Sequence, residues 1–442
     1  MSGSRSLDWL AQPAQALRGR IRVPGDKSVS HRAMMLGSLA EGTTRVTGFL
    51  EGEDTLATAA AFRAMGVRID EPGPGERLVH GVGLHGLRAP QAPIDCGNAG
   101  TGMRLLSGVL AAQSFPSTLV GDDSLSRRPM RRVLEPLGRM GARIAATPSG
   151  TAPLRIDPAA GGLRGIDYES PVASAQVKSC VLLAGLYASG RTRVAEPHPT
   201  RDHTERMLAA FGWPVRREGR WIGVDGAARL SACTVEVPAD FSSAAFFLVA
   251  ASIVPGSDLV LERVGLNPLR TGLLTALRLM GADIEVQAQG LAGGEPVGDL
   301  RVRHARLRGI EVPVELVPDM IDEFPALFAA AACAEGPTTV RGAAELRVKE
   351  SDRLAVMAAG LRALGIGVSE REDGALIEPA PARAGRVDSA GDHRCAMSFA
   401  VLAAAGGGEV RIGDCANVAT SFPGFVELAR RTGMALDMAP AD

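Results

Sequence analysis

Hydrophobic and polar positions follow a pattern that recurs six times along the chain. Each repeat opens with a polar turn, continues into an alanine-rich apolar run, and then gives an extended stretch and a second, more amphipathic run. Residues 30–40 and 325–334 are apolar runs that predict buried helices, whereas residues 43–50 and 338–344 predict short strands. Self-similarity on this scale indicates one supersecondary unit used repeatedly.

A polar segment opens each repeat, and a glycine closes it ahead of a new strand. The closing glycines are Gly66, Gly141, Gly212, Gly281, Gly365 and Gly433. The openings are Asp26-Lys27-Ser28, Asn98-Ala99-Gly100-Thr101, Ser174-Ala175-Gln176, Asp240-Phe241-Ser242-Ser243, Asp322-Glu323 and Asp392-His393-Arg394. Asp, Asn and Ser commonly cap helix N-termini, so all six openings predict capped helices. Several such termini aimed at one cleft would form a strong anion site.

Two nearly identical segments divide the six repeats into three and three: residues 22–26 (RVPGD) and residues 236–240 (EVPAD). Each ends a strand at a proline and begins a capped helix. We therefore predict an α/β protein of two similar domains, each of three βαβαββ-like units with helices packed between sheets. The first domain would span residues 24–237, and the second residues 1–23 and 238–442, with the active site in the cleft between them.

Composition narrows the functional class. A chain of 442 residues with 46% hydrophobic residues can bury large cores, but Pro and Gly interrupt every apolar run before membrane-spanning length. The N-terminus has no signal or transit pattern, which predicts a cytoplasmic, soluble protein. The six cysteines lack CxxC spacing and the histidines lack metal-ligand spacing, so disulfides and zinc are not expected. A net charge of −1 argues against nucleic acid and leaves only local anion binding.

The sharpest motif is PGDKSVSHR, residues 24–32. If a helix starts at Ser28, then Lys27, Ser28 and Arg32 can converge on one phosphate or carboxylate. Walker A spacing is absent, which argues against a P-loop kinase. A capped helix with a solvated Lys and Arg is the plain alternative for this string.

Three other strings carry candidate anion ligands or acids. Gly100 and Gly102 allow close backbone approach at a helix start, and Arg128 before a proline is held extended. In RVKESDR, residues 347–353, we expect Lys349 and Arg353 to share a helix face beside the carboxylate of Glu350. Each string alone also fits an ordinary helix start or a solvated helix face. Their recurrence at equivalent openings argues for one site.

These strings, together with SAQVKS, GDHRCAMSF and TSFPGF, resemble in order the 5-enolpyruvylshikimate-3-phosphate synthase family over nearly the whole chain. The resemblance implies enolpyruvyl transfer from phosphoenolpyruvate to the 5-hydroxyl of shikimate 3-phosphate, with release of phosphate and without metal or organic cofactor. It also implies a monomer and a place in the shikimate pathway to chorismate and the aromatic amino acids.

By matching position, the resemblance implies roles for individual residues. Shikimate 3-phosphate would contact Lys27, Ser28, Arg32, Ser174, Ala175, Gln176, Arg201, Asp322 and Lys349. Phosphoenolpyruvate would contact Lys27, Gly100, Arg128, Gln176, Arg353 and Arg394. The catalytic set would be Asp322 as base for the 5-hydroxyl, Glu350 as acid for the methylene carbon, Lys27 and Lys349.

Two positions depart from the family's most studied bacterial pattern. Ala419-Thr420-Ser421 stands where a lysine is expected before Phe422, and Leu105 replaces a proline. The divergent branch that the chain otherwise resembles can carry alanine at Gly100, where a methyl narrows the pocket, so the response to the family's inhibitor glyphosate is left open.

Two other functions compete with this interpretation. A UDP-N-acetylglucosamine enolpyruvyl transferase would share the fold and the donor, but its loop usually carries a reactive cysteine that residues 121–130 lack. A non-catalytic, anion-binding relative would have lost its chemistry. The presence of Lys27, Asp322, Glu350 and Arg394 argues against that loss.

Overall fold

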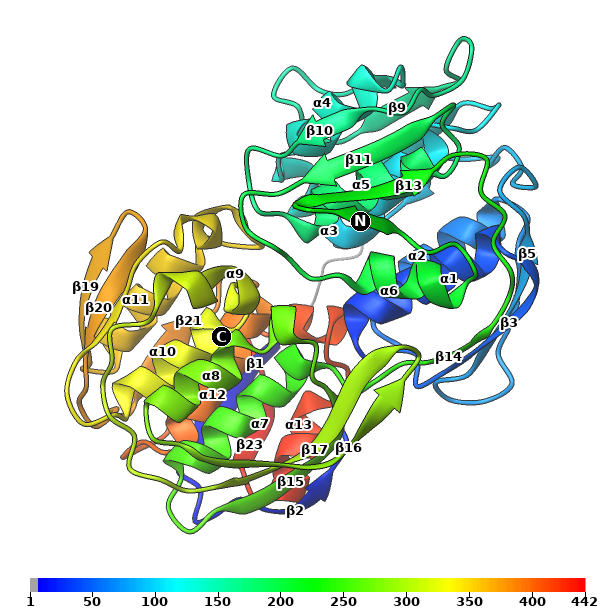
Figure 1. The fold of residues 1–442 in the computed structure, drawn as a ribbon. Helices are drawn as coiled ribbons and strands as arrows, with labels where there is room; N and C mark the ends of the chain where they lie inside the picture. The colour runs from blue at the N-terminus through cyan, green and yellow to red at the C-terminus, as the bar shows by residue number, and fades with distance from the viewer. Residues whose placement is uncertain (1–6, 442) are drawn as a thin grey trace. The chain divides into compact units, whose positions relative to one another are not determined.

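The computed structural model describes residues 7–441, which divide into two compact units (Figure 1). Unit 2 comprises Gly25–Pro238 and Leu291–Glu295. Unit 1 comprises the N-terminal residues through Pro24, Ala239–Gly290, and the chain from Pro296 onward. The borders lie one residue after those expected at 24 and 237, and the short segment Leu291–Glu295 belongs with unit 2 rather than with the surrounding chain.

Unit 2 contains three four-stranded sheets that share one plan. In each, one parallel pair is followed by two antiparallel pairs, in the orders β14-β3-β5-β4, β6-β7-β9-β8 and β10-β11-β13-β12. The strands are β3 (Glu41–Thr47), β4 (Arg68–Asp70), β5 (Arg77–Val82), β6 (Ile94–Asp95), β7 (Ser117–Val120), β8 (Arg143–Ala145), β9 (Leu154–Asp157), β10 (Asp167–Glu169), β11 (Arg191–Ala195), β12 (Arg216–Glu218), β13 (Trp221–Asp225) and β14 (Thr234–Glu236).

Unit 1 repeats this plan in the sheets β16-β17-β15-β2, β18-β20-β19 and β21-β22-β1-β23. Where the other sheets have a fourth strand, the three-stranded sheet has isolated parallel bridges, Arg308 to Glu335 and Glu311 to Thr339. The strands are β1 (Leu7–Gln12), β2 (Arg18–Ile21), β15 (Asp258–Gly265), β16 (Asp283–Ala292), β17 (Glu295–Arg303), β18 (Thr338–Val340), β19 (Gly367–Arg371), β20 (Gly374–Glu378), β21 (Gly385–Asp388), β22 (Val410–Gly413) and β23 (Ala435–Pro440). The predicted fold class, α/β with six repeated units, is confirmed.

Two strands, β2 and β14, pair in one unit although the next helix along the chain belongs to the other unit. β2 leads directly toward the first helix of unit 2, yet it pairs in parallel with β15 of unit 1. β14 leads toward unit 1, yet it pairs in parallel with β3 of unit 2. The chain therefore passes between the units immediately after each of these strands, at the two Pro-containing segments noted in the sequence.

Each repeat has two helices of different character. The first helices are the most buried: α1 (Lys27–Leu39), α3 (Gly100–Leu110), α5 (Ala175–Gly185), α7 (Phe241–Ile253), α10 (Phe324–Ala332) and α12 (His393–Ala404). The second helices are partly exposed: α2 (Glu53–Ala64), α4 (Arg131–Arg139), α6 (His203–Ala210), α8 (Gly272–Leu279), α11 (Arg353–Ala363) and α13 (Phe425–Thr432). Short helical turns complete the set: η1 (Leu125–Arg127), η2 (Pro268–Arg270), η3 (Val314–Leu316), α9 (Val317–Met320), η4 (Ala344–Val348) and η5 (Ala416–Thr420).

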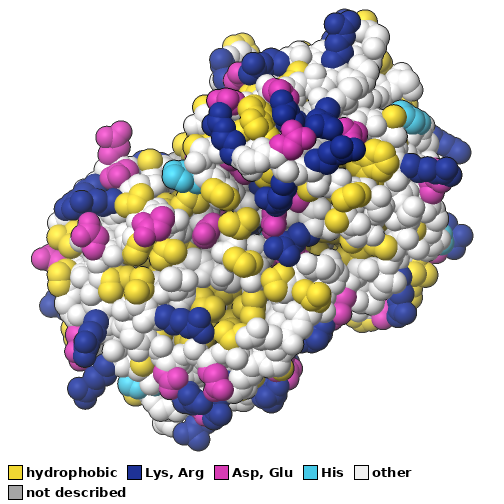
Figure 2. All heavy atoms as spheres, viewed as in Figure 1, with side chains coloured by type: hydrophobic (Ala, Val, Ile, Leu, Met, Phe, Trp, Pro, Cys, Tyr) yellow, Lys and Arg dark blue, Asp and Glu magenta, His cyan; other side chains and the backbone are white. Residues whose placement is uncertain are grey.

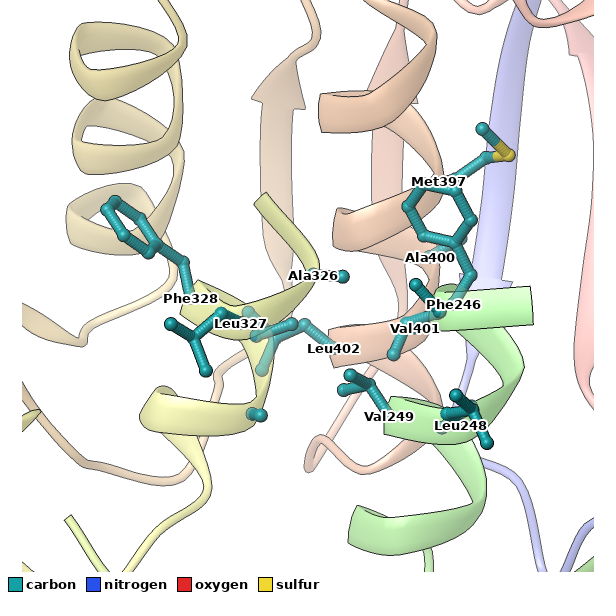
Figure 3. Packing of buried hydrophobic residues seen from close by; sticks show 14 of the residues in the cluster. Phe246, Leu248, Val249, Ala326, Leu327, Phe328, Met397, Ala400, Val401 and Leu402 are labelled. Atoms are coloured by element: carbon teal, nitrogen blue, oxygen red, sulfur yellow. The ribbon is translucent and has the colours of Figure 1, made fainter. Parts of the chain in front are cut away.

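The apolar first helices form the core of each unit. Every residue of α7 and of α10 is buried, because their sequences are apolar on all sides. Figure 3 shows side chains from α7, α10 and α12 meeting in unit 1, among them Val249, Leu327 and Leu402. Unit 2 has a separate core around α1, α3 and α5. Two independent cores explain why the chain divides as it does.

The six closing glycines all lie at positive φ, between +83° and +109°. Each follows the second helix of its repeat and turns the chain toward the next strand. This left-handed conformation is strained for residues with a Cβ and is the usual reason for glycine after a helix C-terminus. The sequence pattern of closing glycines thus reports the C-terminus of every second helix.

The N-caps follow the prediction at four of the six openings. The side chains of Asp26, Ser174, Asp240 and Asp392 accept hydrogen bonds from backbone N–H groups of α1, α5, α7 and α12. The prediction is wrong for α3 and α10, where no side chain caps the helix. Asn98 instead binds the Arg128 guanidinium and the Asp122 carboxylate, and Glu323 accepts from Ser242.

The surface carries both signs of charge. On the face shown in Figure 2, Lys and Arg side chains are interspersed with Asp and Glu, which matches the net charge of −1. Within residues 7–441 no helix combines the length and the apolar character needed to cross a membrane.

Candidate functional site

Unit 1 brings together five residues that the sequence singled out. Asp322 lies just before α10, Lys349 and Glu350 lie between η4 and α11, Arg353 is the first residue of α11, and Arg394 is the second of α12. The Asp322 Oδ1 atom lies 3.5 Å from Arg353 Nη1 and 3.9 Å from Lys349 Nζ. The backbone oxygen of Asp322 accepts a hydrogen bond from Arg394 Nη1 at 3.1 Å.

Arg353 is the centre of this cluster, with only 1% of its side chain exposed. Its Nε lies 2.8 Å from Asp392 Oδ2, and its Nη2 lies 2.7 Å from Glu350 Oε2. Burial disfavours the charged form, but the neighbouring carboxylates of Asp392, Glu350 and Asp322 outweigh burial and raise the pKa of Arg353. The guanidinium is therefore a fixed cation that holds Glu350 in a defined orientation.

Lys349 corrects one expectation. It does not share a helix face with Arg353, because η4 ends at Val348 and α11 begins only at Arg353, so Lys349 has extended backbone. Both cations nevertheless approach Asp322. Burial lowers the pKa of Lys349, and the charges of Asp322 and Glu345 oppose that shift. The loop conformation thus achieves a convergence that helical spacing was expected to give.

The sequence reasoning missed a buried polar layer behind Arg394. The Arg394 Nη1 atom lies 3.7 Å from Glu323 Oε1, and Glu323 accepts a hydrogen bond from the Ser242 hydroxyl. Arg270 donates to Ser242 Oγ at 2.9 Å and to Asp240 Oδ1 at 3.1 Å. Burial raises the pKa of Glu323, while the charges of Arg270 and Arg394 oppose the shift. No motif joins these residues, because their contacts span about 80 residues of sequence.

Unit 2 holds the remaining candidates. Lys27 and Arg32 both lie on α1, and Lys27 Nζ pairs with Asp54 Oδ2 on α2 at 2.8 Å. Arg32 is buried and donates to Thr204 Oγ1 at 2.7 Å, Ser179 Oγ at 2.8 Å and the backbone oxygen of Ser28 at 2.9 Å. The last of these bonds places Arg32 one turn beyond Ser28, as the sequence spacing predicted.

Gly100 lies at the start of α3, against two arginines. A Cβ on Gly100 would lie 3.0 Å from Arg128 Nη1 and 3.7 Å from Arg104 Nη1. Arg104 is buried and donates to Gln176 of α5, whose amide in turn donates to Thr101 Oγ1 at 2.8 Å. The glycine therefore leaves space beside two guanidiniums, and Gln176 is joined to the same cluster.

Ser174, Ala175 and Arg201 complete the candidates of unit 2. Ser174 is the N-cap of α5, Ala175 is its buried first residue, and Arg201 lies in the segment between β11 and α6. Burial lowers the pKa of Arg32 to about 10, the charge of Glu205 opposes this shift, and the charge of Arg201 adds to it. Two guanidiniums close enough to repel each other create a positive potential that can attract an anion.

Residues 419–421 carry hydroxyl groups instead of the expected lysine. Thr420 and Ser421 are buried, and Thr420 Oγ1 donates to the backbone oxygen of Asn417 at 2.7 Å within η5. These hydroxyls can accept or donate hydrogen bonds but cannot supply a positive charge.

The arrangement defines a class of enzyme. Fixed guanidiniums and ammonium groups can hold substrates with several negative charges, and carboxylates held beside them can transfer protons. The cluster of cations and carboxylates in unit 1, together with the buried cations of unit 2, therefore indicates an acid–base enzyme for anionic substrates.

Comparison with known proteins identifies the family. A family described as EPSP synthase (3-phosphoshikimate 1-carboxyvinyltransferase) matches residues 11–428. A protein of Xanthomonas campestris pv. campestris (strain B100) named 3-phosphoshikimate 1-carboxyvinyltransferase is 62% identical over 98% of both chains. A relative of the same name from Alkalilimnicola ehrlichii is 62% identical over 99% of this chain and 98% of its own. The chain belongs to the EPSP synthase family.

Solved structures agree with this assignment. An EPSP synthase structure from Acinetobacter baumannii superposes with a TM-score of 0.88 at 53% sequence identity, covering 98% of this chain and all of that one. A second EPSP synthase structure from the same organism gives a TM-score of 0.86 at 52% identity. The likeness supports the two-unit enolpyruvyl transferase fold.

Proposed function

We propose that the protein is a 3-phosphoshikimate 1-carboxyvinyltransferase of the shikimate pathway, on the route to chorismate and the aromatic amino acids. It transfers the enolpyruvyl group of phosphoenolpyruvate to the 5-hydroxyl of shikimate 3-phosphate and releases phosphate. The main evidence for this proposal is the 62% identity, over 98% of the chain, to a relative of this name. The clustering of Asp322, Lys349, Glu350, Arg353 and Arg394 supports it.

The proposed chemistry begins with addition. Asp322, with Lys349 beside it, accepts the proton of the 5-hydroxyl as that oxygen bonds to the central carbon of phosphoenolpyruvate. Glu350 gives a proton to the methylene carbon, so the double bond becomes a methyl group and a tetrahedral adduct forms. Arg353 holds Glu350 through a 2.7 Å contact, which fixes the direction of proton transfer.

Elimination then forms the product. The bond between the central carbon and the phosphate oxygen breaks, phosphate leaves with the electron pair, and the methyl group returns a proton to Glu350. Both substrates are anionic, and further negative charge develops on the leaving phosphate oxygen. Cations already in place stabilise this charge. We assign this role to Lys27, Arg128, Arg353 and Arg394.

We propose the substrate contacts residue by residue. Shikimate 3-phosphate would contact Lys27, Ser28, Arg32, Ser174, Ala175, Gln176, Arg201, Asp322 and Lys349. Phosphoenolpyruvate would contact Lys27, Gly100, Arg128, Gln176, Arg353 and Arg394. Two phosphorylated carboxylates require this density of cations.

The alternative acceptor, UDP-N-acetylglucosamine, is not favoured, because the matching family and the 62% identical relatives carry the shikimate name. We also propose that the enzyme is monomeric, cytoplasmic and independent of metal and organic cofactors. Light scattering of the purified protein would measure its mass against the 45.9 kDa of one chain.

The test is phosphate release by the purified protein with both substrates, EDTA and no added metal. We expect release only when both substrates are present. Glu350→Gln should reduce kcat by about 10²–10⁴-fold, the usual contribution of a general acid–base group. Release that depends on UDP-N-acetylglucosamine would reassign the acceptor, and binding of both substrates without release would indicate a non-catalytic relative.

A further inference from the structure

A buried ionic cluster lies where α5 and α6 of unit 2 meet. Two of its residues are sequence neighbours of Ser179 and Thr204, which bind Arg32. Lys178 of α5 places its Nζ atom 2.9 Å from Glu196 Oε2 and 2.9 Å from Glu205 Oε1. The ammonium also donates to the backbone oxygen of Thr200 at 2.9 Å. At most 4% of any of the three side chains is exposed. We call Lys178, Glu196 and Glu205 the Lys178 cluster.

The Lys178 cluster joins two segments that carry candidate ligands. Glu196 Oε1 accepts a hydrogen bond from the backbone N–H of Ser174 at 3.2 Å and from Thr200 Oγ1 at 2.6 Å. Ser174 starts α5, and Thr200 immediately precedes Arg201. One buried carboxylate therefore fixes the start of α5 and the segment that bears Arg201, although Ser174 and Glu196 are 22 residues apart in sequence.

The same helix pair also fixes Arg32. Its guanidinium binds Ser179, which follows Lys178, and Thr204, which precedes Glu205. Thr204 Oγ1 donates in turn to Ser179 Oγ at 2.7 Å. Two adjacent polar networks thus cross the same helix interface, one to Arg32 and one to Ser174 and Thr200.

The charge of the cluster complements this arrangement. One ammonium and two carboxylates carry a net charge of −1 when ionised. Burial and the positive charge of Arg201 both lower the pKa of Arg32, and the negative charge of Glu205 opposes that shift. A buried negative group behind the two cations therefore offsets their repulsion before an anionic ligand arrives.

We propose that Lys178, Glu196 and Glu205 are positioning residues for the phosphate of shikimate 3-phosphate, acting through Ser174, Arg201 and Arg32. This proposal rests on the proposed function and its ligand assignment. With at most 4% of each side chain exposed, the three residues would act through these neighbours and not by touching substrate. Apolar residues of similar volume would pack this interface without the cost of burying three charges, so the ions are better explained by orientation than by stability.

The main test is Glu196→Gln, which keeps the size of the side chain but removes the charge opposite Lys178. We expect KM for shikimate 3-phosphate to rise about tenfold, because a hydrogen-bonded charge partner is lost. KM for phosphoenolpyruvate, measured at saturating shikimate 3-phosphate, and kcat should change less than about twofold. The matched control is Glu218→Gln, an exposed ion-pair partner of Arg191 and Arg193 in the same unit, which should leave all three constants unchanged.

A double-mutant cycle with Arg201→Gln separates this proposal from the ligand assignment. If the cluster acts through Arg201, the two substitutions should raise KM for shikimate 3-phosphate by less than the product of their separate effects. If Arg201→Gln alone has no effect, the assignment of Arg201 fails, whereas an effect of Arg201→Gln without one of Glu196→Gln overturns the positioning role. A wild-type protein without turnover would overturn the proposed function.

A second variant guards against loss of folding. Thr200→Val removes the hydroxyl that donates to Glu196 and changes no charge. We expect a KM for shikimate 3-phosphate about threefold higher than wild type, the smaller effect of a neutral hydrogen bond. A lower Tm with unchanged KM would show a purely structural role and would overturn the proposal.

Discussion

At the scale of single residues, the cations of unit 1 differ in how firmly they keep their protons. Arg353 is surrounded by carboxylates that raise its pKa, whereas burial lowers the pKa of Lys349. Lys349 is 3.9 Å from both Asp322 Oδ1 and Glu345 Oε1, so its positive charge faces the proposed base. Of these two cations, Lys349 should therefore lose its charge first as pH rises.

This difference predicts an effect on the pH profile. As pH rises through the lowered pKa of Lys349, below the ordinary lysine value of 10.5, kcat/KM should fall. In Lys349→Arg the guanidinium stays protonated, so the alkaline limb should move to higher pH even if the rate at pH 7 decreases. The measurement is kcat/KM for shikimate 3-phosphate between pH 6 and pH 10.5. An alkaline limb at the same pH in both proteins would contradict the assignment.

The sequence predicted the residues of the candidate site better than it predicted the buried side chains that hold them in place. The string around Glu350 indicated a carboxylate among cations, and the structure places Arg353 2.7 Å from it. Nothing in the sequence indicated Glu323 with Ser242, or Glu196 with Lys178, because such contacts depend on which helices become neighbours. The same limit explains Asn98, a good N-cap residue whose side chain binds Arg128 instead.

At the scale of elements, small residues set how closely the buried helices approach. Gly108 of α3 faces α5, and a Cβ there would lie 2.3 Å from the backbone oxygen of Cys180. Gly138 of α4 has no heavy atom within 4 Å of the same position. The two glycines are both helical and differ in whether a neighbouring backbone blocks a methyl group.

The contrast gives a paired prediction. Gly108→Ala should lower the free energy of unfolding by about 1–3 kcal/mol, because α3 and α5 must separate to admit the methyl group. Gly138→Ala should raise it by about 0.4–1 kcal/mol, since alanine restricts the unfolded chain without a clash. Urea unfolding of both variants measures the difference. Equal stability of the two would show that α3 can shift at no cost.

The order of elements was predictable because glycine at positive φ has a simple physical cause. Gly66 and Gly433 end the first and last of the six second helices, and the sequence pattern marked both. The conformation of Lys349 was not predictable, since charged residues at helical spacing fit a helix and a loop equally well. The exchange of β2 and β14 was also hidden, because a strand's sequence does not specify its partner.

At the scale of the whole molecule, unit 2 is nearly one continuous segment. Residues 25–238 contain all three of its sheets, including β14, and lack only Leu291–Glu295. Within that short segment, Glu295 Oε1 lies 2.8 Å from Nδ1 of the buried His203 on α6. The continuous part of unit 2 should therefore fold alone, with one buried histidine left without its carboxylate.

We expect a protein of residues 25–238 to give a helical and strand-containing circular dichroism spectrum and one cooperative thermal transition. Its stability should increase by about 1–3 kcal/mol when His203 is replaced by Leu, because the group left unsatisfied is then removed. The same substitution in the full chain should be destabilising, since it removes the 2.8 Å contact that His203 Nδ1 makes with the buried Glu295 Oε1. A non-cooperative transition of the fragment would show that unit 2 depends on unit 1.

The position of β1 in its sheet has a consequence for synthesis on the ribosome. β1 lies between β22 and β23, so the first described strand pairs only with strands made from residue 410 onward. At about 5–20 residues per second, translation of the intervening roughly 400 residues takes about 20–80 s. Unit 2 can fold during that time, while the strand that contains Trp9 remains unpaired. Its free backbone N–H and C=O groups can then bind a chaperone or pair with another chain. Of the described strands, the first to leave the ribosome is thus among the last to be paired.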